Sequence, residues 1–279
     1  MFRLTSVGSK LCVIFLLVAF TVTSIGCGSS APLSRQEQAK HALDAGYSHL
    51  IEGERPAALA QVKRSIELDP GLEAYLLKSQ IEYGMGNTTE AYNTLDECAK
   101  LYPSDGEDDF LRAMFLSRER RSSQEIFQEL TVARTDNFVE MDEEFWWEFI
   151  ANEPSFAYFR EQPEYAQLLQ LKPPDAGVVT GCKQNKTGFE KHWWGPQIYI
   201  KEHDMKRLDD INEIIEVLAE FSALLSPAVA AIVGAALLAR RIEILHKDKG
   251  CGVVINWTWV QFVPGVWASI IAYWVTSQK

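Results

Sequence analysis

The sequence predicts an α-helical repeat array followed by a small α+β domain. Three observations carry this prediction: residues 38–103 repeat with a period of 33, residues 176–279 alternate between strand-like and helix-like periodicity, and the charge balance changes near residue 172. With 279 residues and 47% apolar side chains, the chain is long enough for two packed domains.

Residues 1–26 have the layout of a secretory signal. Two basic residues, Arg3 and Lys10, precede an apolar stretch over residues 11–22. A membrane-spanning helix needs about 20 apolar residues, so this stretch is too short to span. We therefore expect residues 1–26 to be removed on export.

The residues at the end of this signal, Ser24-Ile25-Gly26-Cys27, resemble a bacterial lipobox, although Ser24 stands where leucine is usual. The resemblance implies that Cys27 is the lipidated N-terminus and that residues 27–34 are a flexible tether. Gly28 is compatible with an outer-membrane lipoprotein facing the periplasm. The alternative is an ordinary secretory signal with an incidental cysteine.

Residues 38–70 align with residues 71–103 without a gap. The alignment pairs Gly53 with Gly86, Ala58 with Ala91, Val62 with Leu95, Ser65 with Cys98, Leu68 with Leu101 and Pro70 with Pro103. This pattern resembles the tetratricopeptide repeat, a helix-turn-helix unit of about 34 residues. The resemblance implies glycines in the turns, alanines where helices pack closely, and prolines that stop each second helix.

Further helical patterns extend the array to residue 172. Two of them, roughly residues 108–119 and 122–133, suggest a degenerate third repeat. Residues 142–152, and two segments that begin near Pro154 and Pro163, suit a cap over the last apolar face.

An array of this kind has a concave surface that receives a peptide or helix of a protein partner. On the family's pattern, the groove positions are Lys40, Tyr47, Glu73, Gln80 and Tyr83. The alternative is that each is simply part of a solvated helix face. Residues 28–172 hold 14 basic and 27 acidic side chains, so we expect no nucleic-acid partner.

Residues 173–175, Pro-Pro-Asp, end the helical array, and residues 176–279 contain six of the eight tryptophans. The order of patterns is strand, helical hairpin and β-hairpin. We expect a strand over residues 197–201, helices between residues 204 and 247, and a hairpin over residues 253–262 and 266–276. Trp-Trp-Gly at residues 193–195 and Gly-Cys-Gly at residues 250–252 resemble a small domain of secreted bacterial proteins of unassigned function.

No pattern in the chain indicates catalysis, a cofactor or a metal. His192, His203 and His246 lack the spacing of metal ligands, and no nucleophile motif or phosphate-binding glycine loop is present. Because an exported chain meets oxidising conditions, we predict a disulfide between Cys182 and Cys251.

These observations favour a lipid-anchored interaction scaffold of the cell envelope rather than an enzyme. Residues 221–239 carry no charge, so a membrane-active or toxin-like effector acting through helices 204–247 is a second hypothesis. A third is peptidoglycan or carbohydrate binding by exposed tryptophans such as Trp193 and Trp194.

Overall fold

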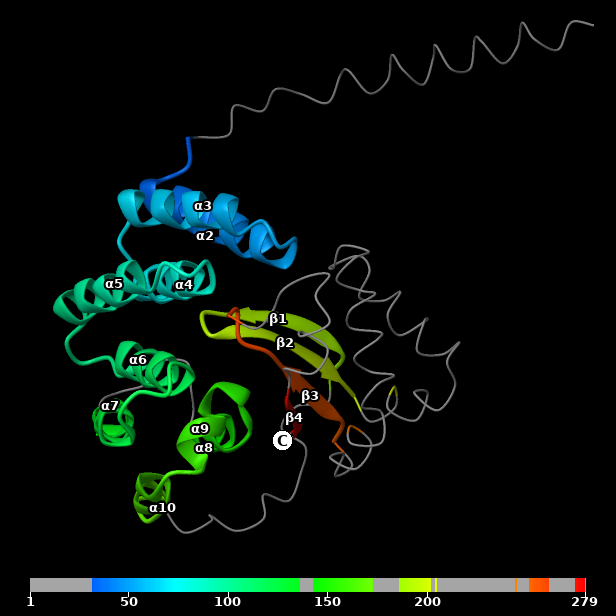
Figure 1. Cartoon of the computed structure of the whole chain (residues 1–279). Coiled ribbons are helices and arrows are strands. Elements are labelled where there is room, and N and C mark those ends of the chain that lie inside the picture. Colours follow the sequence, from blue (N-terminus) through cyan, green and yellow to red (C-terminus); the bar gives the residue numbers. More distant parts are fainter. Residues whose placement is uncertain are drawn as a thin grey trace, which may run out of the picture. The chain divides into compact units, whose positions relative to one another are not determined.

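A computed structural model describes residues 32–135, 143–172, 186–201, 204, 244, 251–260 and 274–278. The described chain is mostly helical with a small antiparallel sheet (Figure 1). Residues 35–279 form one compact unit, and residues 1–34 form another. Cys27 and most of the predicted helical hairpin at 204–247 lie outside the described residues.

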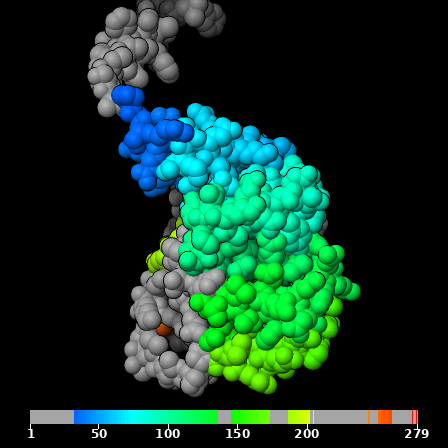
Figure 2. Space-filling model, turned by 90° about the vertical axis from the view of Figure 1, so that its left-hand side faces the viewer, coloured from blue at the N-terminus to red at the C-terminus, as the bar shows by residue number. Residues whose placement is uncertain are grey.

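The first helices follow one another as pairs joined by short turns. The pairs are α2 (Arg35–Ile51) with α3 (Arg55–Leu68), α4 (Leu72–Gly84) with α5 (Thr88–Leu101), and α6 (Glu107–Arg118) with α7 (Ser123–Thr135). Successive pairs lie against one another, and the space-filling view shows them as a continuous layer running from blue to green (Figure 2). The helices expected at residues 108–119 and 122–133 are therefore confirmed to within two residues at each end.

Small residues bring the two helices of a pair close together. Ala58 and Ala91 are fully buried, and a Cβ atom added to Gly46 would lie 2.7 Å from Cγ2 of Val62. Gly53 and Gly86 adopt left-handed backbone conformations in the turns after α2 and α4, with φ of 81° and 83°. The predicted roles of these alanines and turn glycines are confirmed.

Short helices follow the three pairs. They are α8 (Glu143–Asn152), the 3₁₀ turn η2 (Pro154–Phe156), α9 (Ala157–Arg160) and α10 (Pro163–Leu169). Both prolines occupy the first turn of their element, where a missing N–H costs nothing. The ring of Phe110 in α6 packs against Phe149 and Phe156, with centroid distances of 5.0 and 5.6 Å, so these elements cover the apolar side of α6.

The sheet has four antiparallel strands in the order β1-β2-β3-β4. They are β1 (Gly188–His192), β2 (Gly195–Ile200), β3 (Val253–Asn256) and β4 (Trp274–Ser277). The antiparallel pairing of β3 with β4 agrees with the predicted hairpin, although β3 ends at Asn256 and β4 begins only at Trp274. Strand β1 was not predicted, because Gly-Phe-Glu-Lys-His lacks apolar alternation.

The two predicted domains share their apolar cores. One cluster joins Tyr47 and Leu77 of the helices to Ile198, Ile255 and Val275 of the sheet. A second cluster joins further helical residues to Trp193, Trp194 and Val260. The described residues of the expected segments 35–172 and 176–279 therefore share apolar contacts within one compact unit.

Candidate functional site: the inner face of the helices

The five predicted groove residues do not line one open surface. Lys40 is exposed, Glu73 and Tyr83 are half-buried, and Tyr47 and Gln80 are only 3% and 1% exposed. The expectation of an open groove is therefore wrong at Tyr47 and Gln80. The physical reason is that both side chains contact residues that come much later in this same chain.

Gln80, on α4, binds the turn between β1 and β2. Its Nε2 donates a hydrogen bond to the main-chain oxygen of Trp193. Among the described residues, Oε1 of Gln80 and Nε1 of Trp193 are buried without a hydrogen-bond partner. One donor from the helices therefore satisfies one main-chain carbonyl of the turn.

Tyr47, on α2, contacts the segment that follows β3. Its ring centroid lies 5.5 Å from that of Trp259, and Nζ of Lys191 lies 5.6 Å from the Tyr47 ring centroid. The Tyr47 hydroxyl donates to Oε1 of Glu73 at 2.5 Å. Two predicted groove residues are thus hydrogen-bonded to each other while Trp259 covers the ring of one of them.

Arg55, the first residue of α3, joins three parts of the structure. Its Nη1 donates to the main-chain oxygen of Gly84 at 3.0 Å, and its Nη2 donates to that of Val260 at 3.3 Å. Burial, followed by the charge of Arg118, lowers the pKa of Arg55. Arg55 follows a turn and belongs to no apolar pattern, so sequence reasoning missed it.

The two tryptophans that a carbohydrate would need are buried. Trp193 and Trp194 are 1% and 3% exposed, and Trp194 packs against Phe145 and Phe149 of α8 at centroid distances of 5.1 and 5.7 Å. Sugar binding by stacking requires an open indole face. The hypothesis that exposed Trp193 and Trp194 bind carbohydrate is therefore wrong, because both rings belong to the core.

A buried carboxyl group lies where η2 meets the segment after β3. Glu153 is fully buried, and its carboxylate accepts hydrogen bonds from the main-chain N–H and the hydroxyl of Ser155. The Thr258 hydroxyl lies 3.5 Å from Oε1 of Glu153. Burial raises the pKa of Glu153 to about 7, against the opposing effect of Ser155 and Arg118.

A polar network on β2 and β3 consists of Gln197, Tyr199 and Asn256. Nε2 of Gln197 donates to Oδ1 of Asn256 at 2.7 Å, and the Tyr199 hydroxyl donates to Oε1 of Gln197 at 2.6 Å. His192 stacks on Trp194 with centroids 5.0 Å apart, and burial lowers the pKa of His192. His203 and His246 lie outside the described residues. The network contains no nucleophile, and its amide and hydroxyl groups bind one another.

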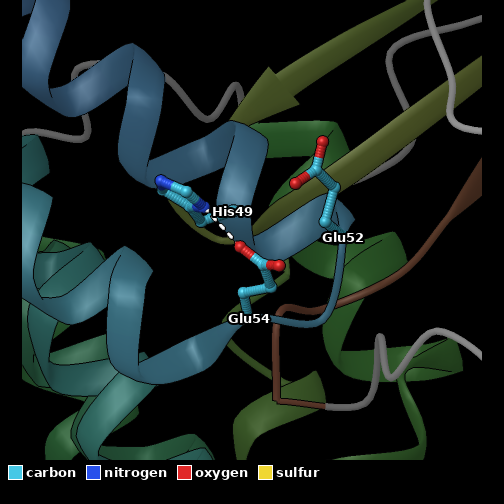
Figure 3. A group of neighbouring side chains, drawn as sticks. All are labelled: His49, Glu52 and Glu54. Atoms are coloured by element: carbon cyan, nitrogen blue, oxygen red, sulfur yellow. Dashed lines mark hydrogen bonds and ion pairs between the residues drawn. The ribbon is translucent and has the colours of Figure 1, made fainter.

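The last turn of α2 and the turn that follows it bring together His49, Glu52 and Glu54, which the sequence did not single out (Figure 3). One ligand atom of each lies within 4.8 Å of the others, and Nδ1 of His49 is 2.8 Å from Oε2 of Glu54. Both glutamates are exposed. This geometry is explained by a surface pair between His49 and Glu54, so we assign no metal to it.

The two cysteines within the described ranges differ in oxidation state. Cys98 is a free, buried thiol, and burial raises its pKa to about 12. Cys251 is disulfide-bonded. Its predicted partner, Cys182, lies outside the described residues, so the pairing stays a prediction.

Neither a family model nor a curated protein matches the sequence. Within the described ranges, no helix combines the length and apolar character needed to cross a membrane. The segment expected to act on membranes, 204–247, falls outside those ranges except for Asp204 and Ile244.

Proposed function

We propose that this chain is a lipid-anchored binding protein of a bacterial cell envelope, without catalytic activity, and that a tetratricopeptide-like array is its scaffold. The observation that carries the proposal is the set of contacts from Tyr47, Arg55 and Gln80 to Trp259, Val260 and Trp193. Through these contacts, the side of the helices that carries Tyr47, Arg55 and Gln80 packs against later residues of the same chain. We call this side the inner face.

Because the chain's own residues cover Tyr47 and Gln80, we expect the partner to bind another surface of the helices. If Trp193 and Trp259 occupy the positions that an external peptide would take, a partner docks on the outward side of the helices. Leu101 at the end of α5 and Val132 on α7 are large apolar side chains that are 53% and 46% exposed. The partner in this proposal is a protein, since a strongly acidic array repels nucleic acid.

Site-specific crosslinking in the native envelope tests this surface. A photoreactive residue at Leu101 or Val132 should give an adduct with a defined envelope protein. The same group at Ala60, which is exposed on α3, shows whether the contact extends to the first pair. If no outward position forms an adduct while one at Lys40 does, the partner uses the inner side and this part of the proposal fails.

The lipid anchor is tested separately. We expect the mature protein to sediment with membranes and to carry an acylated N-terminal Cys27 by mass spectrometry. Substitution Cys27→Ser should release the protein into the soluble periplasmic fraction. The lipoprotein proposal is contradicted if the wild type carries no acyl group and the Cys27→Ser variant still sediments with membranes as the wild type does.

A further inference from the structure

Two arginines from different helix pairs contact the last two residues of α4, Tyr83 and Gly84. Arg55 donates to the main-chain oxygen of Gly84 at 3.0 Å. The Cζ atom of Arg118, the last residue of α6, lies 5.9 Å from the ring centroid of Tyr83. The two arginines thus contact consecutive residues near the end of α4, and the charge of Arg118 contributes to the lowered pKa of Arg55.

Within the described part of the chain, no carboxylate forms an ion pair with Arg55 or Arg118. The two nearby acids have other donors: Glu119 accepts a hydrogen bond from Tyr92 at 3.3 Å, and Glu153 accepts from Ser155. The end of α4 offsets part of the charge of Arg55, because a helix C-terminus is partly negative.

The positive charge of Arg118 is offset only in part: Arg118 favours the charged form of buried Glu153, yet burial still raises the pKa of Glu153 to about 7. Nη1 of Arg118 donates a hydrogen bond to the Ser155 hydroxyl at 3.3 Å. Arg120 and Arg121 follow in the exposed turn before α7. Bringing like charges together next to half-buried Arg55 costs free energy that a bound anion would recover.

Access and donor chemistry also suit an anion. Arg118 is exposed, so a solute reaches it from solvent, whereas Arg55 is half-buried and held by two carbonyls. Guanidinium groups present several N–H donors in a plane, which matches the oxygen spacing of phosphate and carboxylate groups.

We propose that Arg55 and Arg118 form a binding site for an oxyanion, a phosphate or carboxylate group, at the C-terminal end of α4. Neither the lipid anchor nor a protein partner is needed for this site, so it stands or falls independently of the proposed function.

The test is a titration of the folded chain with sodium phosphate at constant ionic strength, with sodium chloride as the balancing salt. We expect a saturable rise in melting temperature and a saturable calorimetric signal. Loss of a charged hydrogen bond corresponds to about tenfold or more in affinity, so Arg118→Ala should bind phosphate at least about tenfold more weakly. Arg118→Lys keeps the charge but loses the planar donors, so its phosphate affinity should lie between those of the wild type and Arg118→Ala.

Arg112→Ala is the matched control, because it removes one arginine from the same helix. Arg112 pairs with Asp96 at 2.7 Å and takes no part in the proposed site, so its phosphate affinity should equal that of the wild type. Sodium acetate in place of phosphate distinguishes a carboxylate site from a phosphate site. If neither anion saturates, or if Arg118→Ala and Arg112→Ala respond alike, the proposal is overturned.

Discussion

The side-chain amide of Gln80 donates to the main-chain oxygen of Trp193, a residue 113 positions later in the chain. Gln80 stands on α4 and Trp193 stands in the turn between β1 and β2, so one hydrogen bond joins the helices to the sheet. Both residues are almost fully buried. Water therefore does not compete for this bond, and its loss would leave a buried carbonyl without this donor.

Substitution Gln80→Leu should lower the free energy of unfolding by about 1–2 kcal/mol. Leucine fills a similar volume but leaves the Trp193 carbonyl without that donor, while removing Oε1 of Gln80 offsets part of the cost. Urea unfolding measures the change. Gln128→Leu, at an exposed position on α7, is the control and should stay within about 0.5 kcal/mol of the wild type. Equal stability of both variants would mean that Gln80 does not hold the two parts together.

Gly46 should not tolerate a methyl group. An added Cβ atom would lie 2.7 Å from Cγ2 of Val62, and a β-branched side chain has little rotamer freedom to move away. Gly46→Ala should therefore lower the free energy of unfolding by about 1–3 kcal/mol, although alanine is the better helix former. Thermal unfolding followed by circular dichroism measures the shift.

The double variant Gly46→Ala with Val62→Ala tests the stated cause. Removing the clashing methyl group should make Gly46→Ala less costly in the Val62→Ala background than in the wild type. Additive losses in the double-mutant cycle would locate the cost of Gly46→Ala elsewhere.

The helices could be predicted from local sequence because their determinants are local. Repeated alanines, the turn glycines Gly53 and Gly86, and the prolines Pro154 and Pro163 each act within one helix or turn. Periodicity also places α6 and α7 to within two residues at each end. Neither observation depends on which parts of the chain meet in space.

The filling of the inner face could not be predicted in this way. The pattern of Tyr47 and Gln80 is that of groove residues, and nothing near them in sequence shows that Trp259 and Trp193 cover them. The same long-range packing buries Trp193 and Trp194, which composition alone left as candidate sugar-binding rings. A helix face that packs against its own chain and one that binds a separate protein use the same kinds of side chain. The sequence of the helices therefore does not distinguish the two cases.

Three buried carboxyl groups should each contribute less stability as pH rises toward 7. Burial raises the pKa of Glu153 to about 7, above its value in an unfolded chain near 4.5. Folding therefore disfavours the charged form, so the contribution of Glu153 to stability is fully present below about pH 4.5 and declines as pH rises through 7. Asp108 and Glu129 share this direction, because burial raises each pKa to about 7.

Glu153→Gln isolates one of these groups. Glutamine keeps one of the two oxygens that accept from Ser155 and carries no charge. The variant should therefore gain stability relative to the wild type between pH 4.5 and pH 8, by an amount on the order of 3 kcal/mol. Urea unfolding across this range measures both curves. Glu90→Gln, at an exposed position, should run parallel to the wild type. A Glu153→Gln curve that is also parallel would show that Glu153 does not titrate on folding.

Thiol counting should separate Cys98 from the other cysteines. Burial raises the pKa of Cys98 to about 12, so little thiolate forms at pH 8 and a thiol reagent should react with the folded protein far more slowly than with the unfolded one. With Cys27 acylated and Cys182 joined to Cys251, protein from the envelope should show one reactive thiol in urea and three after reduction. Three reactive thiols without reduction would contradict the predicted disulfide. A reaction of Cys98 that is as fast in the folded protein as in the unfolded one would contradict the burial of Cys98.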